Sequence, residues 1–279
     1  MMRLRPLVLS DISNALRLSE QAGWNQIDQD WRRLVALWPD TCLAGVVEGQ
    51  LVATGTVACF EDIGWIGMIL VDESQRGRGL GSQMFRAVVE AARGHGVQRF
   101  GLDATDLGRP VYLKSGFADH SAIARWIGRG MIAAPQDGRA ITEADWPAVL
   151  ELDRQAVGVD RGPLLRRLVN EPGSRTCVIH ESNGILGAGW LRQGGAAAMI
   201  GPVVAASADV AARVCTNLLA HAGNQSVIMD LPSGNSVEAV LSRQGFTVQR
   251  RLTRMAKAAS DAPLLTGPQV FAGAGFELG

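Results

Sequence analysis

The order of apolar and polar positions in the first half of the chain predicts alternating strands and helices. Mostly apolar runs are typical of strands in a buried or half-buried sheet, and the expected strands cover 3–9, 41–48, 50–60, 63–71, 97–104 and 117–127. Apolar positions at helical spacing predict helices over 11–23, 27–38, 80–96 and, more briefly, 108–116. Asp11 is expected to cap the first helix, and Gly49 to turn a hairpin. This order predicts a mixed, mostly antiparallel sheet flanked by helices, an α/β (α+β) fold.

The second half of the chain repeats the first at a nearly fixed distance. With an offset of 134, Trp31–Val35 meets Leu165–Val169, and several shorter matches follow in the same order. Near the ends of the halves the offset falls to 129, where Ser115–Phe117 meets Gln244–Phe246. Because the matches share one order and one spacing, we expect two tandem copies of one domain.

A linker at 132–140, rich in Pro, Gly and polar residues, divides the chain into domains of 1–133 and 134–279. The first domain carries 14 basic and 14 acidic side chains and the second 13 of each, so neither has a net charge. Without excess charge a surface does not attract a phosphate backbone or anionic lipids. No apolar run reaches the ~18–20 residues of a membrane span. We therefore expect no nucleic-acid or membrane partner, and a cytoplasmic protein whose four separated cysteines stay reduced. The sequence leaves the oligomeric state open.

A glycine-rich turn with two arginines follows the apolar run at 63–71, where a strand passes into a helix. The first turn of a helix has unpaired N–H groups and the positive end of the dipole. Glycines let a diphosphate approach those groups, and Arg76 and Arg78 add positive charge. A dinucleotide fingerprint would need glycine at Ser82, and a P-loop would need a following Gly-Lys-Ser/Thr. A basic surface turn is the alternative to an anion-binding turn.

The pattern Arg76-x-x-Gly79-x-Gly81 after an apolar strand resembles the acyl-CoA signature of the GNAT superfamily of N-acetyltransferases. The stretch GRPVYLKSGF at 108–117 resembles that family's short helix with a Tyr-x-x-x-Gly-Phe pattern, and the whole chain resembles a tandem GNAT protein. The resemblance implies acetyl-CoA as donor, with its pyrophosphate on the turn and its pantetheine arm along the preceding strand. The implied cofactor-binding residues are Ile69, Leu70, Val71, Arg76, Gly77, Arg78, Gly79, Leu80, Gly81 and Ser82.

The second copy lacks both of these motifs. At the offset of 134, the arginine and the two glycines of the signature correspond to Val210, Arg213 and Cys215, whose side chains would keep a diphosphate away from the backbone. Tyr112 corresponds to Leu241 when the two Gly-Phe pairs are matched. We therefore expect catalysis in the first domain only, with the second shaping the acceptor pocket or forming an interface.

Tyr112 is the only tyrosine of the chain and stands where the resemblance implies a general acid that protonates the departing thiolate. A core tyrosine bonded to backbone is the alternative. Asp103, near the end of the neighbouring strand, is the first candidate for the base that deprotonates the acceptor. The second copy keeps Asp230 in the matching stretch, which favours a structural role for this aspartate. The resemblance also implies that a backbone N–H near Leu70 or Val71 stabilises the oxyanion.

The family builds its acceptor pocket in the loop between the first two helices, which here holds Trp24, Asn25 and Gln26. A packing role for the tryptophan is an equal alternative. Thr105 stands seven residues before the tyrosine, where many family members have a cofactor-binding Asn. Arg109 is a candidate for binding a cofactor phosphate or an acceptor carboxylate, with an exposed salt bridge as the alternative. No histidines or cysteines have metal-ligand spacing, so no metal is expected.

Together these features predict an acetyl-CoA-dependent N-acetyltransferase that acetylates the amine of a small molecule or an amino-acid-like acceptor. The alternative from another class is a non-catalytic acyl-CoA-binding sensor or scaffold, and a nicotinamide-dependent oxidoreductase is more distant. The intact turn together with Tyr112 favours the enzyme.

Overall fold

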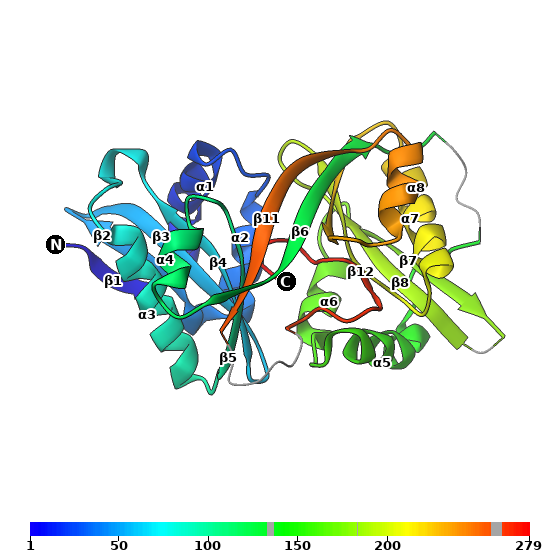
Figure 1. Cartoon of the computed structure of the whole chain (residues 1–279), viewed down its shortest axis with the longest axis horizontal. Helices are drawn as coiled ribbons and strands as arrows, with labels where there is room; N and C mark the ends of the chain where they lie inside the picture. The colour runs from blue at the N-terminus through cyan, green and yellow to red at the C-terminus, as the bar shows by residue number, and fades with distance from the viewer. Residues whose placement is uncertain (133–136, 183, 258–263) are drawn as a thin grey trace.

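The computed structural model describes residues 1–132, 137–182, 184–257 and 264–279. Their twelve strands form one mixed sheet in the order β1-β2-β3-β4-β5-β11-β6-β10-β9-β8-β7, with β12 paired to β9. Neighbouring strands are antiparallel except for the parallel pairs β4–β5 and β9–β10. Figure 1 shows the sheet running through the whole molecule with helices packed against it. The predicted fold class is confirmed.

The first half contains the elements that the sequence pattern predicts. They are β1 (Arg3–Pro6), α1 (Ile12–Gln21), α2 (Asp28–Leu37), β2 (Cys42–Val47), β3 (Gln50–Phe60), β4 (Ile63–Val71), α3 (Leu80–Gly94), β5 (Arg99–Ala104), α4 (Arg109–Leu113) and β6 (Ala118–Arg129). Asp11 is the N-cap residue of α1, as predicted, but its side chain makes no capping hydrogen bond to that helix. Its carboxylate instead accepts from the N–H of Val8 at 3.0 Å and from the guanidinium of Arg5, and so closes the short turn before the helix.

The second half repeats this order. Its elements are α5 (Trp146–Val157), α6 (Gly162–Val169), β7 (Arg175–Glu181), β8 (Gly184–Arg192), β9 (Ala198–Ala205), α7 (Ala208–Ala222), β10 (Ser226–Pro232), α8 (Val237–Arg243), β11 (Thr247–Lys257) and β12 (Val270–Ala272). Part of the predicted linker, 133–136, lies outside the described residues.

The connection between the central strand and the following helix differs between the halves. Residues 72–79 join β4 to α3, whereas Ala206 and Ser207 alone join β9 to α7. The predicted match of Val210, Arg213 and Cys215 with the glycine-rich turn was therefore wrong, because all three lie inside α7. The second half lacks the turn because its connection is shorter, not because other side chains replace the glycines.

The predicted match of Tyr112 with Leu241 is confirmed. The N–H of Phe117 donates to the carbonyl of Tyr112 at 3.1 Å, and the N–H of Phe246 donates to that of Leu241 at 3.0 Å. Tyr112 and Leu241 thus accept the same hydrogen bond at the end of the short helix of their half, but one side chain is a phenol and the other is alkyl.

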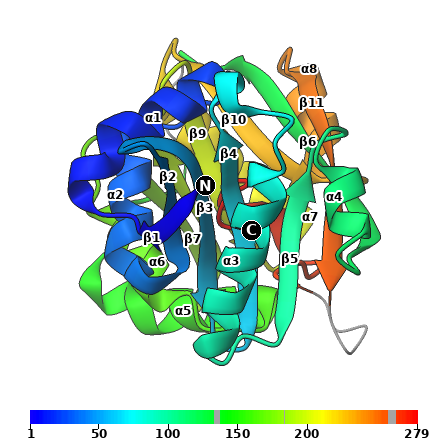
Figure 2. The same ribbon diagram turned by 90° about the vertical axis from the view of Figure 1, so that its left-hand side faces the viewer.

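The two faces of the sheet are covered differently. On one, the α1/α2 face, the helices α1, α2, α5 and α6 share a single apolar core in which Trp31, Trp65 and Trp190 are fully buried. On the other, the α3/α4 face, α3 packs on β3 and β4, and α7 packs on β8 and β9. In Figure 2, α1 and α2 lie on the left of the strands and α4 on the right. One core therefore binds the two halves together, while each half keeps its own core on the opposite face.

The closing strands of the two halves are exchanged. β11 of the second half pairs with β5 of the first, β6 of the first pairs with β10 of the second, and β6 and β11 pair with each other. Figure 1 shows β6 (green) and β11 (orange) side by side in the centre of the molecule. The sheet therefore has no edge between the halves, and each half completes its sheet with a strand of the other.

Each exchanged strand carries an arginine that pairs with an aspartate directly across the ladder. Arg254 of β11 lies opposite Asp103 of β5 and donates to both carboxylate oxygens at 2.8 Å. Arg125 of β6 lies opposite Asp230 of β10 and donates to both oxygens at 2.7 Å. All four side chains are buried. Asp103 and Asp230, which occupy the same position in the two copies, thus each pair with the arginine of the strand that comes from the other half.

We expect Arg254→Met to lower the free energy of unfolding by about 3–5 kcal/mol, because the change leaves Asp103 buried without a partner. The double variant Asp103→Leu/Arg254→Met should recover most of that loss, since neither charge then remains. Urea unfolding measures both, with Arg32→Met, which removes only an exposed pair with Asp28, as the control that keeps the wild-type midpoint. Equal losses in the single and double variants would contradict this account.

Candidate active site

A gap in the sheet opens between β4 and β5. The parallel pairing of these strands runs from Ile63 opposite Arg99 to Ile66 opposite Leu102 and ends there, although both strands continue. Beyond this point the strands share no ladder, so the space between them connects the two faces of the sheet.

A bulge in β4 shapes the edge of this gap. The register with β3 shifts between Thr54 and Thr56, and Met68 adopts a positive φ of 53°. As a result Gly67 and Met68, although consecutive, both face the α1/α2 core, while Ile69 turns to the α3 side. The bulge thus brings the β4 backbone to the opening at the level where the two strands separate.

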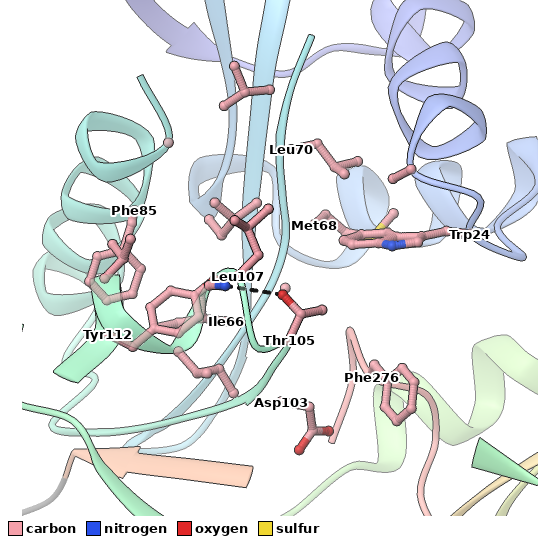
Figure 3. Close-up of a pocket in the computed structure, with 18 of the residues that line it drawn as sticks. Trp24, Ile66, Met68, Leu70, Phe85, Asp103, Thr105, Leu107, Tyr112 and Phe276 are labelled. Carbon is pink, nitrogen blue, oxygen red and sulfur yellow. Dashed lines mark hydrogen bonds between the residues drawn. The ribbon is translucent and has the colours of Figure 1, made fainter. Parts of the chain in front are cut away.

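A cavity of about 720 Å³ follows this gap and reaches both faces of the sheet. On the α3/α4 face it is lined by the glycine-rich turn, Phe85 and Tyr112, and on the α1/α2 face by Trp24, Phe276 and other residues. In Figure 3, Tyr112 and Phe85 lie on one side of the strands and Trp24 and Phe276 on the other, with Thr105 between them. Most predicted site residues line it: Trp24, Gln26, Ile69, Leu70, Val71, Arg76, Gly77, Gly79, Leu80, Gly81, Ser82, Asp103, Thr105 and Tyr112.

The glycine-rich turn presents backbone to this cavity. Gly77 and Gly79 both have φ of 76°, a conformation that favours glycine, and no atom lies within 4 Å of the place where a β-carbon of either would stand. Gly79 is the N-cap of α3, so the unpaired N–H groups of the first helical turn open here. The base of the turn is held by Asp72, which accepts from Arg17 at 2.5 Å. The residues present therefore fit a diphosphate.

The two arginines of the turn differ in position. Arg76 lines the cavity and donates to the carbonyl of Val71 at 3.3 Å. Arg78 donates to the side chain of Gln75 and does not line the cavity. The structure thus brings Arg76, but not Arg78, to the site.

The ring of Tyr112 packs inside the cavity on the α3/α4 face. Its centroid lies 5.1 Å from that of Phe85, and a side chain on Gly108 would meet the ring. Thr105 accepts from the N–H of Gly108 at 3.2 Å and so shapes the turn that carries the tyrosine. Burial raises the pKa of Tyr112 to about 12, so the hydroxyl keeps its proton at neutral pH. A protonated phenol beside the gap is suited to donate a proton to a leaving group.

Asp103 lines the cavity but has both oxygens occupied by Arg254. Burial raises its pKa, and the guanidinium of Arg254 acts in the opposite direction. A base must have a lone pair within reach of the substrate proton, and here the arginine occupies those positions. The geometry favours the structural alternative for this aspartate.

Two of the predicted acceptor residues lie elsewhere. The amide of Asn25 donates to the carbonyl of Ala197 at 2.8 Å and accepts from the N–H groups of Ala196 and Ala197, so it ties the first half to the second. Arg109 pairs with Asp119 at the surface. The structure does not bring either side chain to the cavity.

Several cavity residues come from the second half, and no pattern in the sequence pointed to them. Arg250 and Leu252 belong to the exchanged strand β11, and Phe276 and Glu277 belong to the segment after β12. This segment has no counterpart in the first half. It passes under β4, where Trp65 donates to the carbonyl of Phe276 at 3.0 Å. The repeat predicted a second domain that helps to shape the acceptor pocket, but not which of its residues.

Glu277 is a second buried carboxylate in the cavity, on its α1/α2 face. It accepts from the amide of Gln26 at 3.3 Å and lies 3.9 Å from a guanidinium nitrogen of Arg33. Burial, with repulsion from Asp30, raises its pKa. The Oε1 atom of Gln26 is buried with no hydrogen-bond partner among the described residues. A carboxylate and an amide oxygen thus lie together at this end of the cavity.

Within the described ranges no cluster of three or more His, Cys, Asp or Glu side chains is arranged to hold a metal ion. None of the helices in those ranges is long and apolar enough to cross a membrane.

Two family models match the chain. The one described as "Acetyltransferase (GNAT) family" matches residues 9–117, and the one described as "Acetyltransferase (GNAT) domain" matches residues 149–271. The uncharacterized N-acetyltransferase YitH of Bacillus subtilis (strain 168) is 28% identical over 243 residues, which cover 84% of each chain. Glucosamine 6-phosphate N-acetyltransferase 1 of Oryza sativa subsp. japonica is 31% identical over 134 residues, covering 42% of this chain and 81% of its own length.

Solved structures show the same fold over the whole chain. A putative acetyltransferase from Pyrococcus horikoshii has a TM-score of 0.86 at 20% identity and covers 100% of this chain and 96% of its own. A tandem GNAT protein from the clavulanic acid biosynthesis pathway has a TM-score of 0.63 at 15% identity and covers 94% of this chain and 100% of its own.

We expect Gly81→Val to weaken coenzyme A binding at least roughly tenfold, because a side chain there would obstruct the first turn of α3. Gly81 lines the cavity, and its β-carbon would make only an ordinary contact of 3.6 Å with Val71, so the fold should tolerate the change. Gly94→Val, at the other end of the same helix, where no atom lies within 4 Å of a β-carbon, is the control for the helix itself. Calorimetric titration gives both affinities, and equal affinity in the two variants would mean that the diphosphate binds elsewhere.

Proposed function

The chain belongs to the GNAT acetyltransferase family, and we propose that it transfers the acetyl group of acetyl-CoA to the amine of a small-molecule acceptor at the cavity between β4 and β5. The observation that carries this proposal is that one cavity joins the glycine-rich turn and Tyr112 on one face of the sheet to Glu277 and Trp24 on the other. A donor with a diphosphate and a long arm fits the first side, and an amine fits the second. The two reactants would meet in the gap.

The acceptor enters as an ammonium ion and gives one proton to Glu277. Asp103, the first candidate from the sequence, has no free oxygen, whereas Glu277 pairs only loosely with Arg33 at 3.9 Å. Burial that raises the pKa of a carboxylate brings it closer to the pH at which it can accept such a proton. Glu277 therefore takes the role of base.

The neutral amine then attacks the thioester carbonyl, so that a C–N bond forms and the C–S bond breaks. A backbone N–H of β4 near Leu70 or Val71 stabilises the oxyanion. The departing sulfur takes the proton of the Tyr112 hydroxyl, and the proton that the new amide nitrogen loses restores the phenol. The products are an acetamide, coenzyme A with a free thiol, and one proton.

The test is an acceptor panel of amino acids, small amines and amino sugars, including glucosamine 6-phosphate, with release of free thiol from acetyl-CoA as the measurement. The glucosamine phosphate is included because a relative is named for that substrate. Transfer to a member of the panel is the expected result. Tight binding of acetyl-CoA without transfer to any amine would favour the sensor instead.

We expect Tyr112→Phe to lower kcat on the order of 10²-fold, because it removes the proton donor and keeps the ring that packs on Phe85. Acetyl-CoA affinity should stay close to wild type. The loss should shrink as pH rises, since a thiol near its own pKa leaves without a proton. Steady-state kinetics from neutral to alkaline pH measures this, and wild-type turnover would exclude the acid role.

Glu277→Gln should remove a pH-dependent step from the reaction. The base works as a carboxylate, so its contribution is present above its raised pKa and is lost as pH falls through that value. In wild type kcat/KM should therefore fall on the acid side. In Glu277→Gln this decrease of kcat/KM at acid pH should be absent, and kcat/KM at neutral pH should be lower on the order of 10²-fold. A variant with the wild-type kcat/KM and the wild-type decrease at acid pH would exclude the base role. Its affinity for coenzyme A serves as the control for folding.

A further inference from the structure

We propose that the acceptor carries an acidic group, a carboxylate or a phosphate, as well as its amine, and that Arg250 binds this acidic group. The inference rests on the proposed function, because it concerns the acceptor end of the same cavity. It goes further by naming the substrate class and the residue that selects it.

Arg250 faces the acceptor side of the cavity, not the side of the glycine-rich turn. On β11, Arg250, Leu252 and Arg254 point to one face of the sheet, since their register with β6 is regular over these positions. The guanidinium of Arg254 lies 4.4 Å from the ring centroid of Trp65, which belongs to the α1/α2 core. The turn that precedes α3 belongs to the opposite face. Arg250 is therefore placed for the acceptor and not for the diphosphate.

Arg250 forms no hydrogen bond or ion pair with any of the described residues. Directly opposite it on β6 stands another arginine, Arg125, whose guanidinium is committed to both oxygens of Asp230. Burial, together with repulsion from Arg125, lowers the pKa of Arg250, and the more distant carboxylate of Asp230 offsets this only in part. A half-buried guanidinium beside a like charge is unfavourable unless an anion joins it. An acidic group on the substrate would supply that anion.

The other end of the acceptor side carries the opposite charge. Around Glu277 the charged side chains are four carboxylates (Asp30, Glu171, Asp230 and Glu277) and three guanidiniums (Arg33, Arg125 and Arg192), so one negative charge is in excess when all seven are ionised. The unpartnered Oε1 of Gln26 adds an acceptor for an N–H donor. An ammonium group therefore fits near Glu277 and an anionic group near Arg250, within one cavity.

The experiment uses matched pairs of amines that differ only in the acidic group. Amino acids are compared with their amides and aminoalkyl phosphates with the corresponding amino alcohols, over a range of spacer lengths. Each is titrated calorimetrically into the whole protein saturated with coenzyme A, and each is assayed for transfer by thiol release. In at least one pair we expect the acid-bearing member to bind roughly tenfold or more tightly than its neutral partner. The pair that shows the preference distinguishes a carboxylate from a phosphate.

Arg250→Gln should reduce this preference to near unity, and Arg250→Lys should retain part of it. Arg251→Gln is the matched control, because Arg251 is the exposed neighbour on the opposite face and does not line the cavity. Arg250→Gln should also melt at the wild-type temperature or above, since the repulsion from Arg125 is removed. A lower melting temperature with an unchanged preference would give Arg250 a structural role and overturn the proposal.

Absence of any preference in all pairs, or equal effects of the changes at 250 and 251, would also overturn it. Failure of the proposed function has a different signature. If the acid-bearing amines bind more tightly than their neutral partners but no amine is acetylated, acetyl transfer is refuted and the role of Arg250 stands. If amines are acetylated but the acid-bearing members bind no more tightly, only the role of Arg250 is refuted.

Discussion

The exchange of β6 and β11 is the constraint on which the rest of this structure depends. Each exchanged strand is fixed to the other half by a buried aspartate–arginine pair, Asp103 with Arg254 and Asp230 with Arg125. A buried charge is tolerated only beside its partner, so each pair holds the exchanged strand in register with the strand beside it. Because β11 takes the place beside β5, residues of the second half reach a cavity whose turn and tyrosine belong to the first.

This arrangement gives the second half a role although it lacks the motifs of the first. The shortened connection between β9 and α7 removes the place for a diphosphate, and Leu241 stands where the first half has Tyr112. The same half contributes a carboxylate from the segment after β12 and a guanidinium from β11. In the proposed reaction the donor would thus be held by the first half, and the acceptor by residues of both.

The sequence predicted most of the fold, because local patterns determine the elements. Apolar runs located β2, β3 and β4, and the strand–glycine–helix order located the turn that lines the cavity. The features that the sequence did not predict depend on pairing between strands that are far apart in the chain. The exchange of β6 and β11 leaves each half with the same order of elements, so the repeat cannot reveal it. Arg250 and Glu277 became site residues through that pairing and through a segment without a counterpart in the first half. The predicted match of Val210, Arg213 and Cys215 with the turn failed because a constant offset cannot show a shortened loop.

The most direct test of the account is a crystal structure of the whole chain with coenzyme A. We expect a single coenzyme A per chain, with its diphosphate on the N–H groups of the turn before α3, its arm along β4, and its sulfur in the gap near Tyr112. The α1/α2 side of the cavity, beside Glu277 and Arg250, should stay open for the acceptor. A coenzyme A bound against the second half, or one that fills the space beside Glu277, would contradict the claim that the two halves form one donor side and one acceptor side.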